Sequence, residues 1–368
     1  MLERKRYRTK TMVCTALLLA ACLAGAAAAN QRAGAPAATP SATPGDLTKL
    51  ADGVFVRIVS PDSDAVSNGG VIVLESGVLL FDTYYTPEAA GALAEKLKAV
   101  TPRPVRYIVN SHFHPDHTHG NQVFPAARQV IAATAARRDM LQRDLPALNQ
   151  VQNIARTQVE QLSKELGMEP DVKRRETLRG QLNARQAFLQ SMSALKIVAP
   201  SMTVDDSLSI RDGGREVRLL YLGAGHTDGD LILFLPQEKI VFLGDLFFNA
   251  SLPNAEDATF LEWTKTLGEA LKLDAATFVP GHGQVGTRRD VEDFLTYLKD
   301  LKELVAPAVK RGDTLERVVA DLHLPAKYAS FGFQNFFPAN LQRMYAELKA
   351  LETAAQQRDG VKKEGMLP

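Results

Sequence analysis

Histidines are concentrated in three short stretches of this chain of 368 residues, and one stretch places four of them just behind a single apolar run. Residues 105–109 are Val-Arg-Tyr-Ile-Val, which predicts a buried strand, and the motif His112-x-His114-x-Asp116-His117 follows almost at once. Imidazole and carboxylate are the usual protein ligands of Zn²⁺ and similar metals. The chain must therefore fold so that these side chains meet at the end of a strand, where they can surround two adjacent ions.

Two further histidines and an aspartate lie in glycine-rich segments that follow predicted strands. His226 lies between Gly223 and Asp230, behind an apolar run, and Asp245 and His282 each come directly after another such run. Loops at strand ends can converge on one site, and glycine lets the backbone approach an ion closely. We expect these three residues to join the first cluster.

The composition is that of an ordinary soluble domain, with 45% hydrophobic and 23% charged residues. The formal net charge is +1, and five of the basic residues fall within the first ten positions, so the rest of the chain is slightly acidic. No basic stripe suggests nucleic-acid binding. We expect a small-molecule substrate as partner, no nucleic acid, and leave the oligomeric state open.

The first 29 residues predict an export signal. A basic segment precedes an apolar run at 12–23, which is shorter than the ~20 residues of a comfortable membrane span, and small residues follow. Ala27–Ala29 fits a cleavage site, whereas the residues up to Cys22 resemble a lipoprotein processing site. We expect a signal peptide over 1–29 and a periplasmic or secreted protein. The alternatives are a retained anchor and an outer-membrane lipoprotein, which contacts the membrane only if Cys22 is lipidated.

Residues 30–47 are rich in Ala, Pro, Thr and Ser and predict a flexible tether. Both cysteines, Cys14 and Cys22, lie in the leader. The body therefore uses no disulfide, no thiolate metal ligand and no cysteine nucleophile.

Apolar patterning predicts an α/β domain over 48–300 and a helical C-terminal extension over 301–368. Helices are expected at 87–100 and 260–272, and the region from 288 to 351 is mostly helical in pattern. The two halves have similar strand and helix content, which favours two layers folded against each other. Strands are expected at 54–59, 70–74, 78–81, 105–109, 202–210, 216–222, 231–235, 240–243 and 276–279.

Residues 137–196 interrupt the succession of predicted strands and helices. They form two polar segments whose leucines recur at helical spacing on either side of a turn at Gly167–Pro170. This pattern predicts a helical hairpin inserted into the α/β domain. Either a structural arm or dimer contact, or a lid over the active site, would account for it.

The whole series of Asp82, the His112–His117 motif, His226, Asp245 and His282 resembles the metallo-β-lactamase superfamily over about residues 50–285. The resemblance implies a four-layer αββα sandwich with two Zn²⁺ ions at one edge between the sheets. It implies that one zinc is held by His112, His114 and His226, that the other is held by Asp116, His117 and His282, and that Asp245 bridges both. It also implies that Asp82 fixes the histidine loop by hydrogen bonds.

A water between two zinc ions has its pKa lowered from ~15.7 to about 7, so hydroxide is available at neutral pH. The resemblance therefore implies a dinuclear zinc hydrolase that cleaves an ester, thioester, lactone or amide by attack of a metal-bridging hydroxide. Asp116 would orient that hydroxide and pass its proton to the leaving group.

Three positions indicate which branch of the superfamily the chain resembles. His114 stands where the di-iron oxygen-reducing members have Glu, and Asp245 stands where the best-known β-lactamases have Cys or Ser. His114 therefore favours a hydrolytic zinc site, and Asp245 together with His117 favours thioesterase, lactonase or general hydrolase relatives with the glyoxalase II-like and lactonase-like ligand set. His119 departs from the usual Gly-Gly of the family, and we expect it either to support the loop or to contact metal or substrate.

Three rival functions remain open: a true β-lactamase, which suits export, a mononuclear iron sulfur-dioxygenase on the same scaffold, and a non-catalytic binding module. Several aromatic residues either pack the core or line the substrate cleft. They are Phe247 and Phe248 after Asp245, and the cluster Phe331–Phe337 in the C-terminal region. Thr227 and Asp228 are expected to shape the His226 loop.

Overall fold

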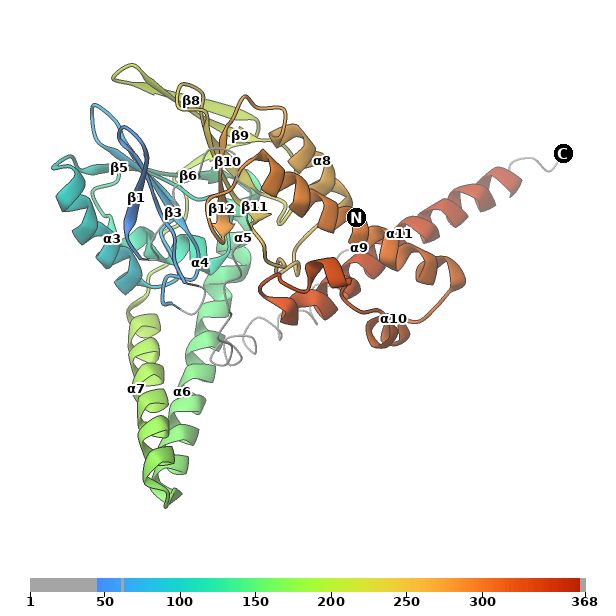
Figure 1. Cartoon of the computed structure of the whole chain (residues 1–368), viewed down its shortest axis with the longest axis horizontal. Coiled ribbons are helices and arrows are strands. Elements are labelled where there is room, and N and C mark those ends of the chain that lie inside the picture. Colours follow the sequence, from blue (N-terminus) through green and yellow to red (C-terminus); the bar gives the residue numbers. More distant parts are fainter. Residues whose placement is uncertain (1–44, 61–62, 365–368) are drawn as a thin grey trace.

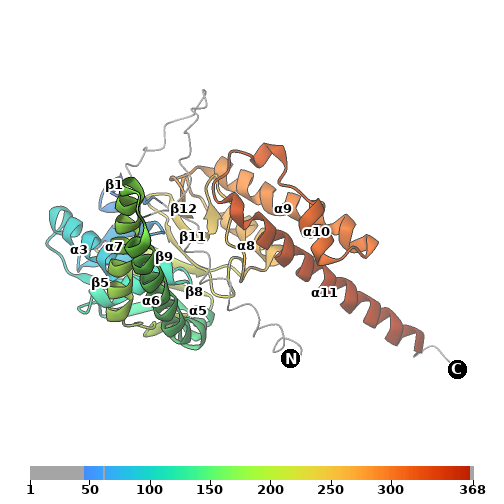
Figure 2. The ribbon, with the colours of Figure 1, turned by 90° about the horizontal axis from the view of Figure 1, so that it is seen from below.

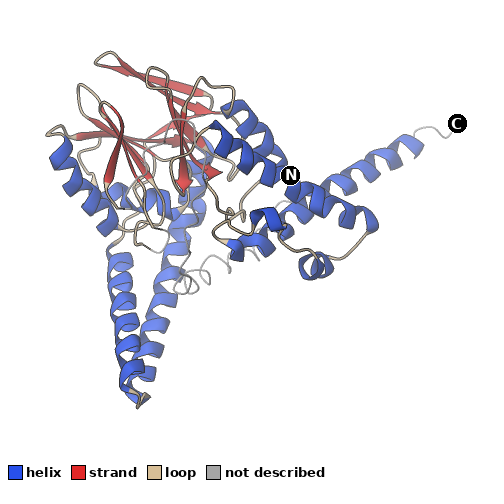
Figure 3. Cartoon of the chain, viewed as in Figure 1, coloured by secondary structure: helices blue, strands red, loops and turns tan. Residues whose placement is uncertain are grey.

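The computed structural model describes residues 45–60 and 63–364, so the expected signal peptide and nearly all of the expected tether lie outside the described residues. Two β-sheets lie face to face, and helices cover their outer faces (Figure 1; strands are red in Figure 3). None of the helices among the described residues combines the length and apolar character that crossing a membrane requires.

The first sheet contains seven strands in chain order, antiparallel up to the fourth and parallel from there on. Helix α3 (Pro87–Val100) covers its outer face; Thr86 caps this helix by accepting a hydrogen bond from the Ala89 amide at 3.1 Å. The strands are β1 (Leu47–Ala51), β2 (Val54–Arg57), β3 (Gly69–Val73), β4 (Val78–Phe81), β5 (Val105–Val109), β6 (Gln129–Ala133) and β7 (Met202–Val204).

The second sheet has the order β12-β11-β10-β9-β8. Helices α8 (Phe260–Ala270) and α9 (Arg288–Arg311) cover its outer face. Its strands are β8 (Ser207–Asp212), β9 (Arg215–Tyr221), β10 (Leu231–Leu235), β11 (Ile240–Phe248) and β12 (Thr277–His282).

Successive apolar side chains of a strand point alternately to the inner and the outer face of its sheet, and both faces are therefore covered by another layer. In β4, Leu79 and Phe81 face the second sheet, whereas Val78 and Leu80 face α3. In β10, the odd-numbered leucines pack between the sheets, and Ile232 packs on the outer side. Because side chains of a strand point alternately to opposite faces, each sheet is buried on both sides. The predicted four-layer sandwich is confirmed.

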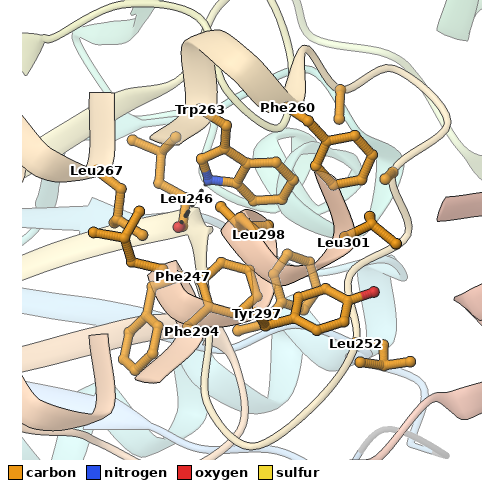
Figure 4. Close-up of a cluster of buried hydrophobic side chains, with 14 of the residues drawn as sticks. Leu246, Phe247, Leu252, Phe260, Trp263, Leu267, Phe294, Tyr297, Leu298 and Leu301 are labelled. Atoms are coloured by element: carbon orange, nitrogen blue, oxygen red, sulfur yellow. Dashed lines mark hydrogen bonds between the residues drawn. The ribbon is translucent and has the colours of Figure 1, made fainter. Parts of the chain in front are cut away.

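The outer core of the second sheet is aromatic. Trp263 of α8 is fully buried, and its indole Nε1 donates a 3.0 Å hydrogen bond to the Leu246 carbonyl of β11 (Figure 4). The rings of Phe260 and Phe294 lie 5.9 and 5.6 Å from this indole. The packing fixes α8 and α9 on the strand that carries Asp245.

The structure corrects three expectations about strands. β1 and β6 were not expected, and the single strand expected at 202–210 is two strands, since the chain passes from one sheet to the other between Val204 and Ser207. The strand expected at 240–243 continues to Phe248 through a register shift at Gly244, where φ is +53°. A bulge of this kind extends a strand while it turns the next side chain to a new direction.

The inserted region forms the predicted helical hairpin. Helices α6 (Leu145–Met168) and α7 (Val172–Ala194) run side by side and project away from the sheets (Figures 1 and 2). They follow α5 (Thr134–Asp139) and one π-helical turn, η3 (Met140–Asp144). The base of the hairpin packs on the body through Met192 and Tyr85, which are both buried.

The C-terminal region is helical, as predicted. Helix α9 runs unbroken through the boundary expected at residue 300 and ends at Gly312, whose φ of +78° suits glycine. Helices α10 (Leu315–Asp321) and α11 (Phe337–Glu364) follow. The segment between them includes the short helical turns η4 (Ala326–Tyr328) and η5 (Gln334–Phe336).

Asn68, immediately before β3, ties the first sheet to the end of β12. Its side-chain amide donates to the carbonyls of Pro280 and Gly283 at 3.0 and 2.9 Å, and its side-chain oxygen accepts from the Val59 amide at 3.1 Å. The residue is buried, so none of these groups can turn to water instead.

We therefore expect Asn68→Ala to lower the free energy of unfolding by about 2–4 kcal/mol, because it leaves several buried polar groups without partners. Guanidinium denaturation measures this change. The exposed hairpin variant Asn153→Ala serves as control and should shift the midpoint little. A midpoint for Asn68→Ala equal to that of the control would contradict the inter-sheet role.

Candidate metal centre

The seven expected ligands come from both sheets and meet at one edge of the sandwich. β5 ends at Val109 and leads directly into the histidine loop, while β9 ends at Tyr221 and leads into the loop that carries His226. Asp245 lies in β11, and His282 is the last residue of β12. The carboxyl ends of β5, β11 and β12 therefore deliver ligands to the same place.

The first ligand group is formed by His112, His114, His226 and Asp245, whose donor atoms lie within 4.8 Å of one another. Nδ1 of His114 and Nε2 of His226 are 3.0 Å apart, and Nε2 of His226 is 3.2 Å from Oδ2 of Asp245. His112 and His226 are fully buried. Three imidazoles and a carboxylate thus converge on one small volume.

The second ligand group is formed by Asp116, His117 and His282. Oδ2 of Asp116 lies 3.4 Å from Nε2 of His117 and 3.3 Å from Nε2 of His282. Asp245 reaches this group as well, because its two oxygens lie 3.2 Å from His117 and 3.4 Å from His282. One carboxylate therefore stands between the two groups.

Unsatisfied polar atoms show that this cluster suits metal ions. Nε2 of His112, Nε2 of His117 and Oδ1 of Asp245 are buried and make no hydrogen bond with any described residue. Buried polar atoms are normally paired, and unpaired ones are costly. Imidazole nitrogen and carboxylate oxygen are the donors that zinc accepts, so the residues present fit such an ion.

Asp82 and Ser111 orient the histidines from behind. Oδ2 of Asp82 lies 2.8 Å from Nδ1 of His117, and its Oδ1 accepts a 2.7 Å hydrogen bond from the Ser111 amide. The Ser111 hydroxyl lies 3.0 Å from Nδ1 of His112. Holding the outer nitrogen in this way fixes the tautomer and leaves Nε2 free for an ion.

Asp257 orients His114 in the same way, from the loop between β11 and α8, which no sequence pattern had marked. Nε2 of His114 donates to Oδ2 of Asp257 at 2.9 Å, which leaves Nδ1 as the ligand atom. Arg143, in the π-helical turn of the insertion, donates to the other oxygen of Asp257 at 2.6 Å. Burial opposes ionisation of Asp257, but His114 and Arg143 together lower its pKa.

His119 belongs to neither ligand group. Its Nε2 lies 3.1 Å from Oδ1 of Asp144, again from the π-helical turn, and its ring stacks on Tyr85 at 5.4 Å. The structure therefore places His119 behind the loop and in contact with the base of the hairpin.

Two glycines make room for Asp245. A Cβ atom at position 281 would lie 1.9 Å from Oδ1 of Asp245, and one at Gly244 would lie 2.5 Å from the Cβ of Ser111. The bulge at Gly244 also lets Leu243 and Leu246 both face the outer core, while Asp245 between them turns to the ligands. A regular strand would have sent Asp245 into the apolar core.

The pKa values of the clustered histidines are shifted in both directions. Burial lowers the pKa of His114, but Asp257 reverses this shift and raises it. Burial lowers the pKa of His112 well below its usual range and that of His226 to about 3. Burial acts in the same direction on His282, but Asp245 and Asp116 reverse the shift and raise its pKa to about 9. The pKa of His117 is raised well above its usual range in the same way, by Asp245 and Asp116 against the effect of burial. Metal binding would release protons from those of these histidines that are protonated.

The other residues singled out in the sequence either shape the loop that carries His226 or pack in the hydrophobic core. Thr227 shapes the His226 loop, but its partner is Asp230, which accepts from the Thr227 amide and hydroxyl, rather than Asp228, whose side chain is exposed. Burial raises the pKa of Asp230 to about 7. Phe247 belongs to the outer core, and Phe248 is buried against His226 and His282.

Comparison with known proteins assigns the chain to a family. Residues 63–282 match the family model described as the metallo-beta-lactamase superfamily. A linear primary-alkylsulfatase from Pseudomonas sp. is 24% identical over 275 residues, which are 71% of this chain and 51% of that protein. A type 2 metallo-beta-lactamase from Bacteroides fragilis is 31% identical over 114 residues, which are 30% of this chain and 46% of that protein.

Among solved structures, a stereoselective inverting sec-alkylsulfatase from Pseudomonas sp. superposes with a TM-score of 0.57 at 18% identity. The match covers 82% of this chain and 49% of that one. The chain therefore spans about half the length of the relatives it matches. The family match covers more than half of the chain and contains all seven ligands, from His112 to His282. The chain belongs to the metallo-beta-lactamase superfamily, and the matched segment contains the His/Asp cluster that could hold metal ions.

Proposed function

We propose that this chain is a dinuclear zinc hydrolase that cleaves an ester, thioester, lactone or amide bond. One observation carries the proposal: Asp245, a buried carboxylate, lies within 3.2–3.4 Å of imidazoles from both ligand groups. A centre for one ion needs only the first group, whereas this arrangement supports two adjacent ions. Bound zinc would act as a Lewis acid and lower the pKa of a coordinated water to about 7.

The residues of the chain would hold the metal ions and orient the attacking water. His112, His114 and His226 would hold one ion, and their outer nitrogens are fixed by neighbours in two of the three cases. Asp116 is the ligand carboxylate that reaches the open edge, with 19% of its side chain exposed. Burial opposes ionisation of Asp116, but His117 lowers its pKa well below its usual range, so the carboxylate stays ionised and would orient the attacking water by accepting its hydrogen bond.

A sulfate ester is a second candidate substrate. The match to the alkylsulfatase spans 71% of this chain, whereas the match to the Bacteroides β-lactamase spans only 30%. The sulfatase match therefore extends over more of the surrounding scaffold. The presence of Asp245 where well-known β-lactamases have Cys or Ser also favours a substrate other than a β-lactam. The basic and apolar segments of residues 1–29 support export as part of the same proposal.

Hydrolysis of a substrate panel tests the proposal. The zinc-loaded protein is offered p-nitrophenyl acetate, an acyl thioester, an acyl homoserine lactone, dodecyl sulfate and a chromogenic cephalosporin. We expect turnover of at least one of the first four and loss of it by at least about 10³-fold in His112→Ala/His114→Ala, because the group that stabilises developing charge is lost. His323→Ala, outside the centre, is the matched control.

Turnover of the cephalosporin alone would replace the proposal with a β-lactamase. Turnover that persists in the double variant would show that the cluster is not the active site.

The single tryptophan reports metal binding without a substrate. The Trp263 indole lies 5.5 Å from the His226 ring, and no other tryptophan occurs in the chain. We expect titration with Co²⁺, which quenches indole fluorescence at short range, to saturate at two equivalents in the wild type. His112→Ala should abolish the tighter phase of quenching, and His323→Ala should not. Saturation at one equivalent in the wild type would refute the dinuclear assignment.

Gly281→Ala tests the position of Asp245. Because the added methyl group would lie 1.9 Å from Oδ1 of Asp245, the carboxylate must move. We expect zinc affinity to fall by about 10- to 100-fold, the usual scale when ligand orientation is lost. Competition with a chromogenic chelator measures it. Gly268→Ala in α8, where a new Cβ has no neighbour within 4 Å, is the control and should bind normally.

A further inference from the structure

We propose that Phe333 forms an apolar wall of the substrate site beside His282, and that the substrate carries an apolar acyl, alkyl or aryl group that packs against this wall. The inference rests on the proposed hydrolase function and adds a substrate class to it. It concerns a residue in the C-terminal region, outside the segment 63–282 that matches the family.

The position of the ring carries the proposal. The Phe333 ring lies 6.1 Å from the His282 ring at an angle of 87° and is half-buried. His282 and Asp116 are the ligands of the second group that keep some exposure to solvent, with 9% and 19% of their side chains accessible. Phe248 also stacks on His282, at 5.1 Å, but is buried and offers no surface. Phe333 is therefore the aromatic ring with free surface at the open edge of the centre.

The backbone around Phe333 is fixed to the strand that carries Asp245. The Gly332 amide donates to the Ala250 carbonyl at 2.9 Å, and the Gly332 carbonyl accepts from the Leu252 amide at 3.0 Å, two to four residues beyond the end of β11. Phe331 packs against Tyr328 at 5.1 Å on the other side. The ring is thus held in place by the C-terminal region rather than carried on a free loop.

Strain at Phe333 is the second observation. Its φ is +55°, in the left-handed region that bulky residues rarely adopt and that glycine or asparagine occupies at lower cost. Strained residues cluster at functional sites, where the surrounding structure holds them. Stability alone therefore favours glycine or asparagine at this position, and a contact made by the ring would offset the cost.

Two pairs of variants separate strain from the loss of the ring. Phe333→Ala and Phe333→Gly both remove the ring, but only glycine relieves the strain. Lys239→Ala and Lys239→Gly make the same changes at a residue with φ of +56°, next to the start of β11 and at the opposite end of that strand from Asp245. At both positions we expect the glycine variant to melt at a higher temperature than the alanine variant, the reverse of the usual order.

Binding of metal-directed probes then tests the wall. Acetohydroxamic, butyrohydroxamic and octanohydroxamic acid share one metal-binding group and differ in chain length. We expect their affinity for the zinc-loaded wild type, measured by calorimetry, to rise with length, by up to about fourfold for each methylene that becomes fully buried. Both Phe333 variants should bind acetohydroxamic acid normally and lose most of the dependence on chain length. Both Lys239 variants should keep it.

The outcomes distinguish this inference from the proposed function. If the Phe333 variants retain the wild-type dependence on length, or if the wild type shows none, Phe333 only packs the C-terminal region and the wall is refuted. If zinc binds but acetohydroxamic acid does not bind to the zinc-loaded wild type, the proposed hydrolytic centre itself fails.

Discussion

Asp245 is a carboxylate buried at the meeting point of four imidazoles, and the rest of the centre is arranged around this charge. Burying a carboxylate is costly unless opposite charge or hydrogen bonds compensate for it. Here the compensation comes from His117 and His226 at 3.2 Å and from His282 at 3.4 Å, which are delivered by three separate segments of the chain. Only His117 comes from the first sheet, so the two sheets must be closed before Asp245 has all three of these partners. The apolar layer between the sheets provides that closure, and Asn68 locks the edge at which the ligands meet.

The inserted hairpin is connected to the centre through its base rather than its tip. One π-helical turn supplies both Arg143, which holds the partner of His114, and Asp144, which holds His119. A π-helical turn contains an extra residue relative to an α-helix and often occurs at functional sites. The shafts of α6 and α7 project away from the sheets (Figure 1). Through Arg143 and Asp144, the base of the hairpin can hold the histidines in position without covering the site. The contacts of these two residues therefore fit a positioning role better than the role of a lid.

The sequence was informative where chemistry and periodicity are local. The residues of the cluster were singled out because imidazole and carboxylate follow predicted strands, and their division into two ligand groups was implied by the resemblance to the superfamily. The helix over 87–100 was predicted to the residue from the helical spacing of its apolar side chains. Asp257 was missed because it lies in a loop without apolar period, 143 residues from the histidine that it contacts. The true length of β11 was missed because the strand continues through a bulge at Gly244, which lies against Ser111 of the loop that follows β5. Both omissions are tertiary contacts for which no neighbouring residue in the sequence gives a signal.

Chemistry and substrate choice have different structural origins in this chain. All seven expected ligands lie inside the segment that matches the superfamily, so family membership accounts for the presence of the His/Asp cluster. Phe333 lies outside that segment and reaches His282 only because Gly332 is hydrogen-bonded to the chain beyond β11. Because relatives named as an alkylsulfatase and as a metallo-beta-lactamase both match the chain, membership of the superfamily does not by itself identify a substrate. In our proposal, substrate selection involves Phe333, which the fold brings beside His282 from the C-terminal region, and the left-handed backbone there is a cost that metal binding alone does not explain.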